Sequence, residues 1–257
     1  MSFMKNSVQN EEKKIILQLK GLHKNFGGVV AADDINLEIR QGETFGLIGP
    51  NGAGKTTLLN LIMGIYDVSK GETILNGENI TKFPTHKRAK LGIARTFQHP
   101  RLLSRCDIRT NIMMGTDLAK KRGLEKENTD EEIMKLLKYV DMDHVKLEDS
   151  IQKLSYGQQK LLEIIRSLLT NPEILLLDEP AAGLNSRELD YVAILIKVAN
   201  ERGQSVLLIE HAMDLVMSVC DRITVLNFGH QIATGTPEEI QNDEGVLKAY
   251  LGGAIHA

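Results

Sequence analysis

The residues best suited to chemistry lie in a glycine-rich stretch between Thr44 and Met63. Residues Gly49–Thr56 read Gly-Pro-Asn-Gly-Ala-Gly-Lys-Thr and fit the pattern G-x-x-x-x-G-K-[ST]. Such a loop directs consecutive backbone N–H groups and a helix N-terminus toward an anion. Lys55 adds a positive charge for the β- and γ-phosphates, and Thr56 adds a hydroxyl for Mg²⁺. The pattern predicts a nucleoside triphosphate site, with a glycine-rich turn that binds nothing as the alternative.

Two neighbouring carboxylates form the second chemically capable group. Asp178 and Glu179 follow the apolar run Ile174–Leu177, which suits a central parallel strand that ends at the edge where α/β sites form. Neighbouring strand side chains point to opposite faces, so we expect different roles for them. Asp178 suits the Mg²⁺ shell, and Glu179 suits orienting or polarising an attacking water. The alternative is a pair of acids in a surface turn.

Three single residues are weaker candidates because their types are also common in structural positions. Gln98 follows the strand-like run Ile93–Phe97 and is a possible metal or water ligand, or a solvated side chain. His211 follows the run Ser205–Ile209 and suits a hydrogen bond to a γ-phosphate or a water, or a structural position. Phe26 precedes two glycines and is either a ring presented on a loop for base stacking or a core residue.

A helix start at Ser155 carries a further signal. Ser155 and Gln158 have the spacing of an S-x-x-Q capping box, and apolar residues continue at helical spacing to Leu169. A capping box does not require Gly157, which weakens a helix. Its presence indicates the close approach of another group to the helix end.

The elements that must position these residues alternate between strands and helices. The apolar run Phe45–Ile48 suits a buried strand, and Leu58, Leu61, Ile62 and Ile65 continue as a helix. Further strands are predicted at Ile15–Lys20, Ile35–Ile39 and Gly71–Gly77, a hairpin at Ile223–Asn227 and Gln231–Ala233, and a helix start at Thr236-Pro237. This order predicts an α/β protein with a mainly parallel sheet and an antiparallel β layer near the N-terminus.

Two charged segments lie between these elements. Residues Lys82–Arg109 contain eight basic side chains and one acid, Asp107, which indicates a local basic surface that is either solvated or faces an acidic partner or anionic head groups. Residues Leu124–Asp149 contain nine acids and four bases. Ile133, Leu136, Leu137 and Val140 fall there at helical spacing and predict an amphipathic helix in an inserted helical region.

Composition excludes several classes of protein. The chain has 257 residues, 42% of them hydrophobic and 25% charged, as in ordinary globular proteins. A net charge of -3 gives no general attraction to nucleic acid, so no nucleic-acid partner is expected. Cys106 and Cys220 are too far apart in sequence for a Cys-x-x-Cys site. Residues 1–14 are polar and predict a disordered leader, and without an apolar signal core we expect a cytoplasmic location.

Several motifs together resemble the ATP-binding-cassette (ABC) ATPases from about residue 15 to the end of the chain. They are Gly49–Thr56, Gln98, Leu154–Gln158, Ile174–Glu179 and His211, in the order of that family. Three further stretches are similar to the ATPase subunits of branched-chain amino acid importers: Arg95–Leu102, Glu179–Asn185 and Ala249–Gly252.

The resemblance implies the ABC ATPase fold. This fold has a P-loop NTPase core with a mainly parallel sheet, an N-terminal antiparallel β layer and an inserted α-helical subdomain. It would divide the chain into a leader (1–14), a RecA-like nucleotide-binding core with the β layer (15–99 and 165–257) and a helical signature subdomain (100–164).

The resemblance also implies a composite site, in which two ATPase subunits, identical or different, enclose two ATP molecules head to tail with Mg²⁺. The ATP-binding residues would be Phe26, Gly49, Pro50, Asn51, Gly52, Ala53, Gly54, Lys55, Thr56 and Thr57. The residues acting across the dimer would be Ser155, Tyr156, Gly157 and Gln158. Mg²⁺ would be held by Thr56, Gln98 and Asp178, Glu179 would be the catalytic base, and Gln98 and His211 would complete the catalytic set.

The sequence departs from the broad family at three positions and from the branched-chain subfamily at one. Tyr is commoner there than Phe26, Gly than Tyr156, and Asp than Asn185. The second and third departures fit the branched-chain subfamily. Ala212 stands where that subfamily often has Asp, and the sequence does not explain it.

The function that the resemblance implies is an ATPase subunit that drives an importer of branched-chain or other hydrophobic amino acids. Its partners would be integral membrane permease subunits and, indirectly, an external solute-binding protein, which would place it on the inner face of the cell membrane. The alternative is a soluble ABC ATPase of an assembly system, such as iron–sulfur cluster assembly. Motifs shared by all cassettes do not separate these two functions.

Overall fold

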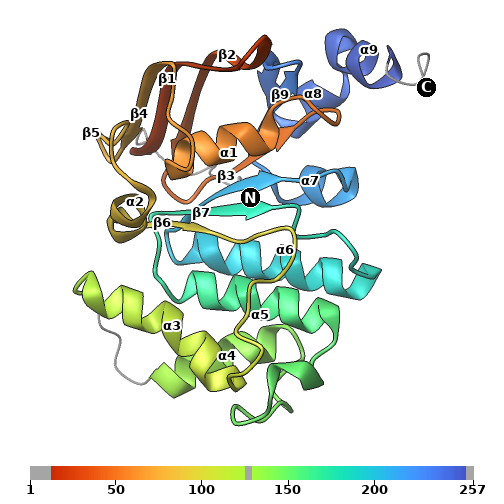
Figure 1. Cartoon of the computed structure of the whole chain (residues 1–257). Coiled ribbons are helices and arrows are strands. Elements are labelled where there is room, and N and C mark those ends of the chain that lie inside the picture. Colours follow the sequence, from red (N-terminus) through yellow and green to blue (C-terminus); the bar gives the residue numbers. More distant parts are fainter. Residues whose placement is uncertain (1–12, 125–128, 253–257) are drawn as a thin grey trace, which may run out of the picture.

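The computed structural model of the chain describes residues 13–124 and 129–252. Residues 1–12 of the predicted leader lie outside the described residues. Figure 1 shows two sheets with helix α1 (Lys55–Met63) between them, and helices α3 (Ile108–Lys121) to α6 (Ser186–Glu201) beyond the second sheet. The predicted α/β architecture, with an antiparallel layer and an inserted helical region, is confirmed.

An antiparallel sheet covers one side of α1. Its described strands follow the order β2-β1-β4-β5: β1 (Ile15–Phe26), β2 (Val29–Arg40), β4 (Lys70–Leu75) and β5 (Glu78–Asn79). Ile35, Leu37 and Ile39 are buried while the residues between them face outward, which is the alternation that predicted this layer. β1 continues beyond its predicted end because pairing with β2 extends to the Phe26–Val29 pair.

The second sheet is parallel except for its last strand. Its described order is β10-β9-β3-β8-β7-β6, with β3 (Thr44–Ile48), β6 (Ile93–Arg95), β7 (Ile174–Asp178), β8 (Ser205–Ile209), β9 (Arg222–Asn227) and β10 (His230–Gly235). Every residue of β3, β7 and β8 is buried, as expected for strands covered on both faces. Since these strands are parallel, their carboxyl ends meet at one edge.

The two faces of this sheet belong to different hydrophobic clusters. On β7, Ile174 and Leu176 pack in the cluster that contains α1 and the antiparallel sheet. Leu175 and Leu177 pack in the cluster that contains the helices beyond the sheet. By the same alternation, Asp178 faces the α1 side.

Helix α1 is shorter than predicted. It ends at Met63 with a left-handed Gly64, and Ile65 lies exposed beyond it rather than continuing the helix. The end of the helix is capped by Arg88, which is 1% exposed and donates to the carbonyls of Leu61 and Ile62 at 2.7 Å each. The prediction that Arg88 contributes to a basic surface is therefore wrong. Arg88 lies on α2 (Thr85–Leu91) and holds two helices together.

The helical region begins after residue 107. It contains α3, α4 (Thr129–Tyr139), the 3₁₀ turn η1 (Ile151–Lys153) and α5 (Tyr156–Leu168). The predicted amphipathic helix is confirmed, since Ile133, Leu136, Leu137 and Val140 are buried. The predicted boundary between residues 164 and 165 falls inside α5, and the division into two subdomains stays a prediction.

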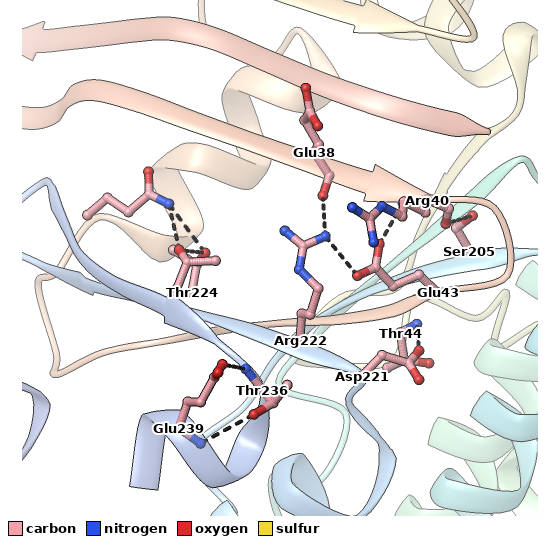
Figure 2. Close-up of polar contacts among 12 residues, drawn as sticks. Glu38, Arg40, Glu43, Thr44, Ser205, Asp221, Arg222, Thr224, Thr236 and Glu239 are labelled. Carbon is pink, nitrogen blue, oxygen red and sulfur yellow. Dashed lines mark hydrogen bonds and ion pairs between the residues drawn. The ribbon is translucent and has the colours of Figure 1, made fainter. Parts of the chain in front are cut away.

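The C-terminal elements complete the second sheet and its cover. They are α7 (Met213–Val219), the predicted β9–β10 hairpin, α8 (Pro237–Gln241) and α9 (Glu244–Gly252). Figure 2 shows the capping box between Thr236 and Glu239 that starts α8.

Strand β9, which lies between β10 and β3, is tied to the segment that joins the two sheets. In Figure 2, Arg222 donates to the Glu43 carboxylate at 3.1 Å and to the Glu38 carbonyl at 3.4 Å. Over the described ranges, the helices are too short or too polar to cross a membrane.

Candidate active site

The phosphate loop, residues 49–56, runs from β3 into α1 with a backbone that requires glycine. Gly49 and Gly54 have φ values of 151° and 103°. A Cβ at Gly49 would lie 2.1 Å from the Leu226 carbonyl oxygen, and one at Gly54 would lie 2.3 Å from the Ala31 carbonyl oxygen. Gly54 gives α1 no side-chain cap. The first N–H groups of α1 therefore face outward for an anion.

Lys55 lies inside this loop. Its side chain is 6% exposed and its ammonium donates to the carbonyls of Gly49 at 2.7 Å and Pro50 at 3.1 Å. Burial lowers the pKa of Lys55, and the negative charges of Glu179 and Asp178 oppose that shift. The loop thus holds a buried positive charge next to both predicted carboxylates.

Asp178 is fixed by a residue that the sequence placed on a basic surface. Its carboxylate accepts from Arg95 Nη2 at 2.7 Å, and Arg95 Nη1 donates to the Asn60 amide oxygen of α1 at 2.7 Å. Both members of the ion pair are buried. The surface interpretation is wrong for Arg95. It holds for Arg109, which is partly exposed and pairs with the exposed carboxylates of Asp130 and Glu148.

The structure brings Glu179, Gln98 and His211 together from the ends of three strands. Gln98 Nε2 donates to Glu179 Oε2 at 3.0 Å, and His211 Nε2 lies 3.3 Å from Glu179 Oε1. Glu179 has a φ of 48°, which turns the chain sharply after β7. Its side chain keeps 23% of its surface exposed, so that a water can reach the carboxylate.

The donor set at this edge fits Mg²⁺. Thr56 offers a hydroxyl, Gln98 an amide oxygen and Asp178 a carboxylate, all of them hard oxygen ligands. Among the described residues no group of three or more His, Cys, Asp or Glu could hold a metal. A site with few protein ligands is typical of Mg²⁺, because this ion keeps several waters and binds through one or two carboxylates and substrate phosphates.

Two buried side chains hold the segment that carries Glu179, and sequence reasoning missed both. Lys160 on α5 is 3% exposed and donates to the carbonyls of Glu179 at 2.8 Å, Pro180 at 3.2 Å and Ala182 at 3.0 Å. Glu210 is 3% exposed and accepts from the backbone N–H groups of residues 181, 211 and 212. Only the position of Glu210 directly before His211 gave any sequence signal.

The signature segment, Leu154–Gln158, starts α5 as predicted. Ser155 Oγ accepts from Gln158 N at 3.1 Å, and Gln158 Oε1 accepts from Ser155 N at 2.9 Å, which confirms the capping box. The close approach at Gly157 comes from the chain itself, because a Cβ there would lie 2.0 Å from Glu188 Oε1 on α6. Glu188 is in turn hydrogen-bonded to Asn185 N at 3.0 Å.

Phe26 is the last residue of β1 and lies at the surface. Its ring is 42% exposed, with the edge of Tyr66 at a centroid distance of 5.1 Å and the Lys24 ammonium 5.0 Å from the ring centroid. This exposure excludes the alternative that Phe26 is a core residue.

Comparison with known families gives two matches along the chain. Residues 32–182 match the family described as ABC transporter. Residues 230–256 match the family described as branched-chain amino acid ATP-binding cassette transporter.

Individual proteins of known name are similar over almost the whole chain. BraF of Pseudomonas aeruginosa, a high-affinity branched-chain amino acid transport ATP-binding protein, is 41% identical over 93% of this chain and 98% of its own. LivG of Escherichia coli, which has the same description, is 40% identical with the same coverage. Among solved structures, the ADP conformation of MJ1267, an ATP-binding cassette of an ABC transporter, has a TM-score of 0.80 at 29% identity and covers 93% of this chain and 99% of its own.

Proposed function

The chain belongs to the ABC transporter family, and from this premise we propose how its residues act as the ATP-hydrolysing subunit of an amino acid importer. Family membership establishes ATP binding and hydrolysis coupled to transport. The importer assignment is carried by one observation, the match of residues 230–256 to the branched-chain amino acid transporter family. This segment lies outside the motifs that all cassettes share. It favours an importer over a soluble assembly ATPase.

Each ATP is bound between two copies of the ATPase, or between this chain and a related one. The triphosphate lies on the phosphate loop, where Lys55 and the uncapped N-terminus of α1 face it. Ser155 and Gly157 of the other subunit close the site at the γ-phosphate. The exposed hydroxyl of Ser155, at the start of a second helix, supports this arrangement.

Hydrolysis begins with a water next to Glu179. The carboxylate accepts a proton from that water while Gln98 and His211 hold its two oxygens in place. Lys55 offsets the charge that develops on the phosphate oxygens. Thr56, Asp178 and Gln98 would hold Mg²⁺, which when bound neutralises charge on the β- and γ-phosphates.

The work of transport lies in closing and opening the ATPase dimer. ATP binding draws the two subunits together, and hydrolysis releases them. Integral membrane permease subunits convert this motion into transport, and an external solute-binding protein delivers the amino acid. The chain is then a peripheral protein on the inner face of the membrane.

Replacement of the proposed base tests this mechanism. Glu179→Gln keeps the side-chain volume but removes the proton acceptor, so we expect ATP-dependent dimers on gel filtration and steady-state hydrolysis reduced by at least ~100-fold. The matched control is Glu173→Gln, at the opposite end of the same strand, where Glu173 pairs with Arg122 at 3.6 Å. Near-normal hydrolysis by Glu179→Gln would remove Glu179 from the role of base.

The transport assignment needs a separate experiment. Uptake of radiolabelled leucine, isoleucine and valine should fall in a strain that lacks this chain and return when it is restored. Copurification with integral membrane subunits is expected from the same cells. Association with soluble scaffold proteins alone would instead favour the assembly ATPase.

A further inference from the structure

A buried carboxylate on α5 accepts hydrogen bonds from the backbone on both sides of Gln98. Glu163 is 1% exposed, and its Oε1 accepts from the backbone N–H of Arg101 at 3.0 Å. Its Oε2 accepts from the backbone N–H of Phe97 at 3.4 Å. We call residues 97–101 the Gln98 loop. Its two ends are therefore fixed to the same side chain.

Helix α5 makes further contacts with this loop. Arg166 donates to the Arg101 carbonyl at 2.9 Å and lies 3.3 Å from Glu163 Oε1. The Tyr156 hydroxyl donates to the Gln98 carbonyl at 3.3 Å. Within the loop, the Arg101 guanidinium lies 4.0 Å from the centroid of the Phe97 ring. Together these contacts hold the loop against α5 from its first residue to its last.

Packing alone does not explain why a carboxyl group is buried at position 163, because its burial costs solvation free energy. Loss of solvation raises the pKa of Glu163, and hydrogen bonds from the Arg101 and Phe97 backbones and the charge of Arg166 oppose that shift. An apolar side chain at this position would fill the space without a desolvation penalty. What it would not supply is two acceptors for the N–H groups that flank Gln98.

The same helix also holds the other partner of Gln98. Lys160, three residues before Glu163, donates to the carbonyl of Glu179. The Gln98–Glu179 hydrogen bond is thus set by two side chains of α5, one on each side of it. The signature segment begins this helix, so a shift of that segment would move both catalytic partners.

We propose that Glu163 is a positioning residue for ATP hydrolysis, which holds the Gln98 loop so that the Gln98 side chain reaches Glu179. Through α5, it also couples the signature segment, which serves the ATP of one site, to the catalytic residues of the other site in the same chain. The proposal rests on the function proposed above, in which Gln98 and Glu179 act on ATP.

Glu163→Gln in the full-length chain tests the proposal. The amide supplies one acceptor oxygen and places an N–H₂ donor against the second backbone N–H, so one end of the loop loses its hold. We expect kcat for ATP to fall about 10-fold to 100-fold, as for a misplaced catalytic group. KM and ATP affinity should stay within about twofold because the phosphate loop is unchanged. Hydrogen exchange should rise in peptides that cover residues 96–103.

Ser167→Ala is the matched control on the same helix. Ser167 is also buried, but its hydroxyl donates only to the backbone carbonyl of Glu163. This variant should keep kcat and the exchange rate of residues 96–103 near the wild-type values, although it perturbs the same helix. A purely structural role for Glu163 predicts that the two variants lose activity in proportion to their loss of melting temperature.

A double variant separates action through Gln98 from any other effect. In a Gln98→Ala background, Glu163→Gln should cause no further loss of kcat, because the group that it positions is already gone. The proposal would be overturned if the double variant lost kcat by the product of the two single losses, or if Glu163→Gln alone kept the wild-type kcat. Either result would leave the catalytic role of Gln98 intact. Unchanged kcat in Gln98→Ala would overturn the role of Gln98 itself. If Glu163→Gln does not fold, Glu163→Asp, which keeps the charge but shortens the reach, is judged by the same outcomes.

Discussion

The phosphate loop and the signature segment both begin a helix, but they differ in charge and in capping. At the phosphate loop, α1 starts at Gly54 without a side-chain cap, and the charged groups of Lys55 and Asp178 are buried close by. At the signature segment, α5 starts with a full capping box, and residues 154–158 carry no charged side chain. The start of α1 is open and has charged groups close by. The start of α5 is capped and has no charged side chain of its own, although the Glu188 carboxylate of α6 lies beside Gly157.

This difference assigns the two segments different parts in binding. In the proposed function, Lys55 and the open N-terminus of α1 attract ATP to the phosphate loop of a single chain without a partner. The signature segment offers a helix dipole, equivalent to roughly half a positive charge at its N-terminus, and a hydroxyl. It has little to bind until another subunit brings a phosphate to it. In the proposed dimer, ATP is the contact that joins two chains.

Among the variants that test this difference between the two segments, Lys55→Ala should have the largest effect. Lys55→Ala deletes the buried charge, and a hydrogen bond to a charged group contributes about 1.5–3 kcal/mol, so we expect ATP affinity to fall about 10-fold to 100-fold. Calorimetric titration of the full-length chain measures this. Lys90→Ala, an exposed lysine on α2, is the control and should bind ATP normally. Unchanged affinity in Lys55→Ala would mean that the open N-terminus of α1 alone binds the triphosphate.

A smaller effect is expected on the signature side. Ser155→Ala removes a cap worth about 1 kcal/mol and the hydroxyl that we propose faces the partner's ATP. Stability should therefore fall modestly, and turnover about tenfold. Thr236→Ala removes the equivalent cap from α8 and is the control. Denaturant unfolding and steady-state hydrolysis distinguish the two roles. If both variants lose the same stability and neither loses turnover, Ser155 is only a helix cap.

The parts of the site that could be predicted from the sequence are those whose structure depends on residues close together in the chain. Glycine spacing, a buried apolar strand and a lysine identify the phosphate loop, and the capping box at Ser155 follows from residues three positions apart. Asp178 and Glu179 were recognisable because a continuous apolar run ends there. These signals depend on neighbours in the chain, so a single sequence contains them.

The parts that could not be predicted depend on pairs distant in sequence. Arg88 and Arg95 carry the charge of a solvated surface in sequence, yet they cap α1 and pair with Asp178. Nothing near Gly157 indicates that Glu188, from another helix, fills the space beside it. Glu163 has the same limitation, since its partners are backbone N–H groups about sixty residues away. Composition shows that charges are present, but only the fold shows which of them are buried.

The smallest predicted effect concerns binding of the adenine ring of the nucleotide rather than of its phosphates. If the exposed ring of Phe26 stacks on adenine, Phe26→Ala should weaken binding of ATP and ADP alike by about 5-fold to 10-fold, within the range of 1–3 kcal/mol for base stacking. Phe26→Tyr keeps the ring and should bind normally. Phe228, which is 77% exposed in the β9–β10 turn, provides the control, and Phe228→Ala should leave affinity unchanged.

The ratio of ATP affinity to ADP affinity distinguishes an effect on the adenine from an effect on the phosphate loop. Loss of Lys55 should reduce ATP affinity more than ADP affinity because its charge serves the γ-phosphate as well as the β-phosphate. Loss of Phe26 should reduce both equally, because the adenine is the same in the two nucleotides. Titrations of both variants with ATP and ADP measure the two ratios. An effect of Phe26→Ala on ATP alone would mean that the ring acts on the phosphate loop, through neighbours such as Lys24 and Tyr66, and not on the base.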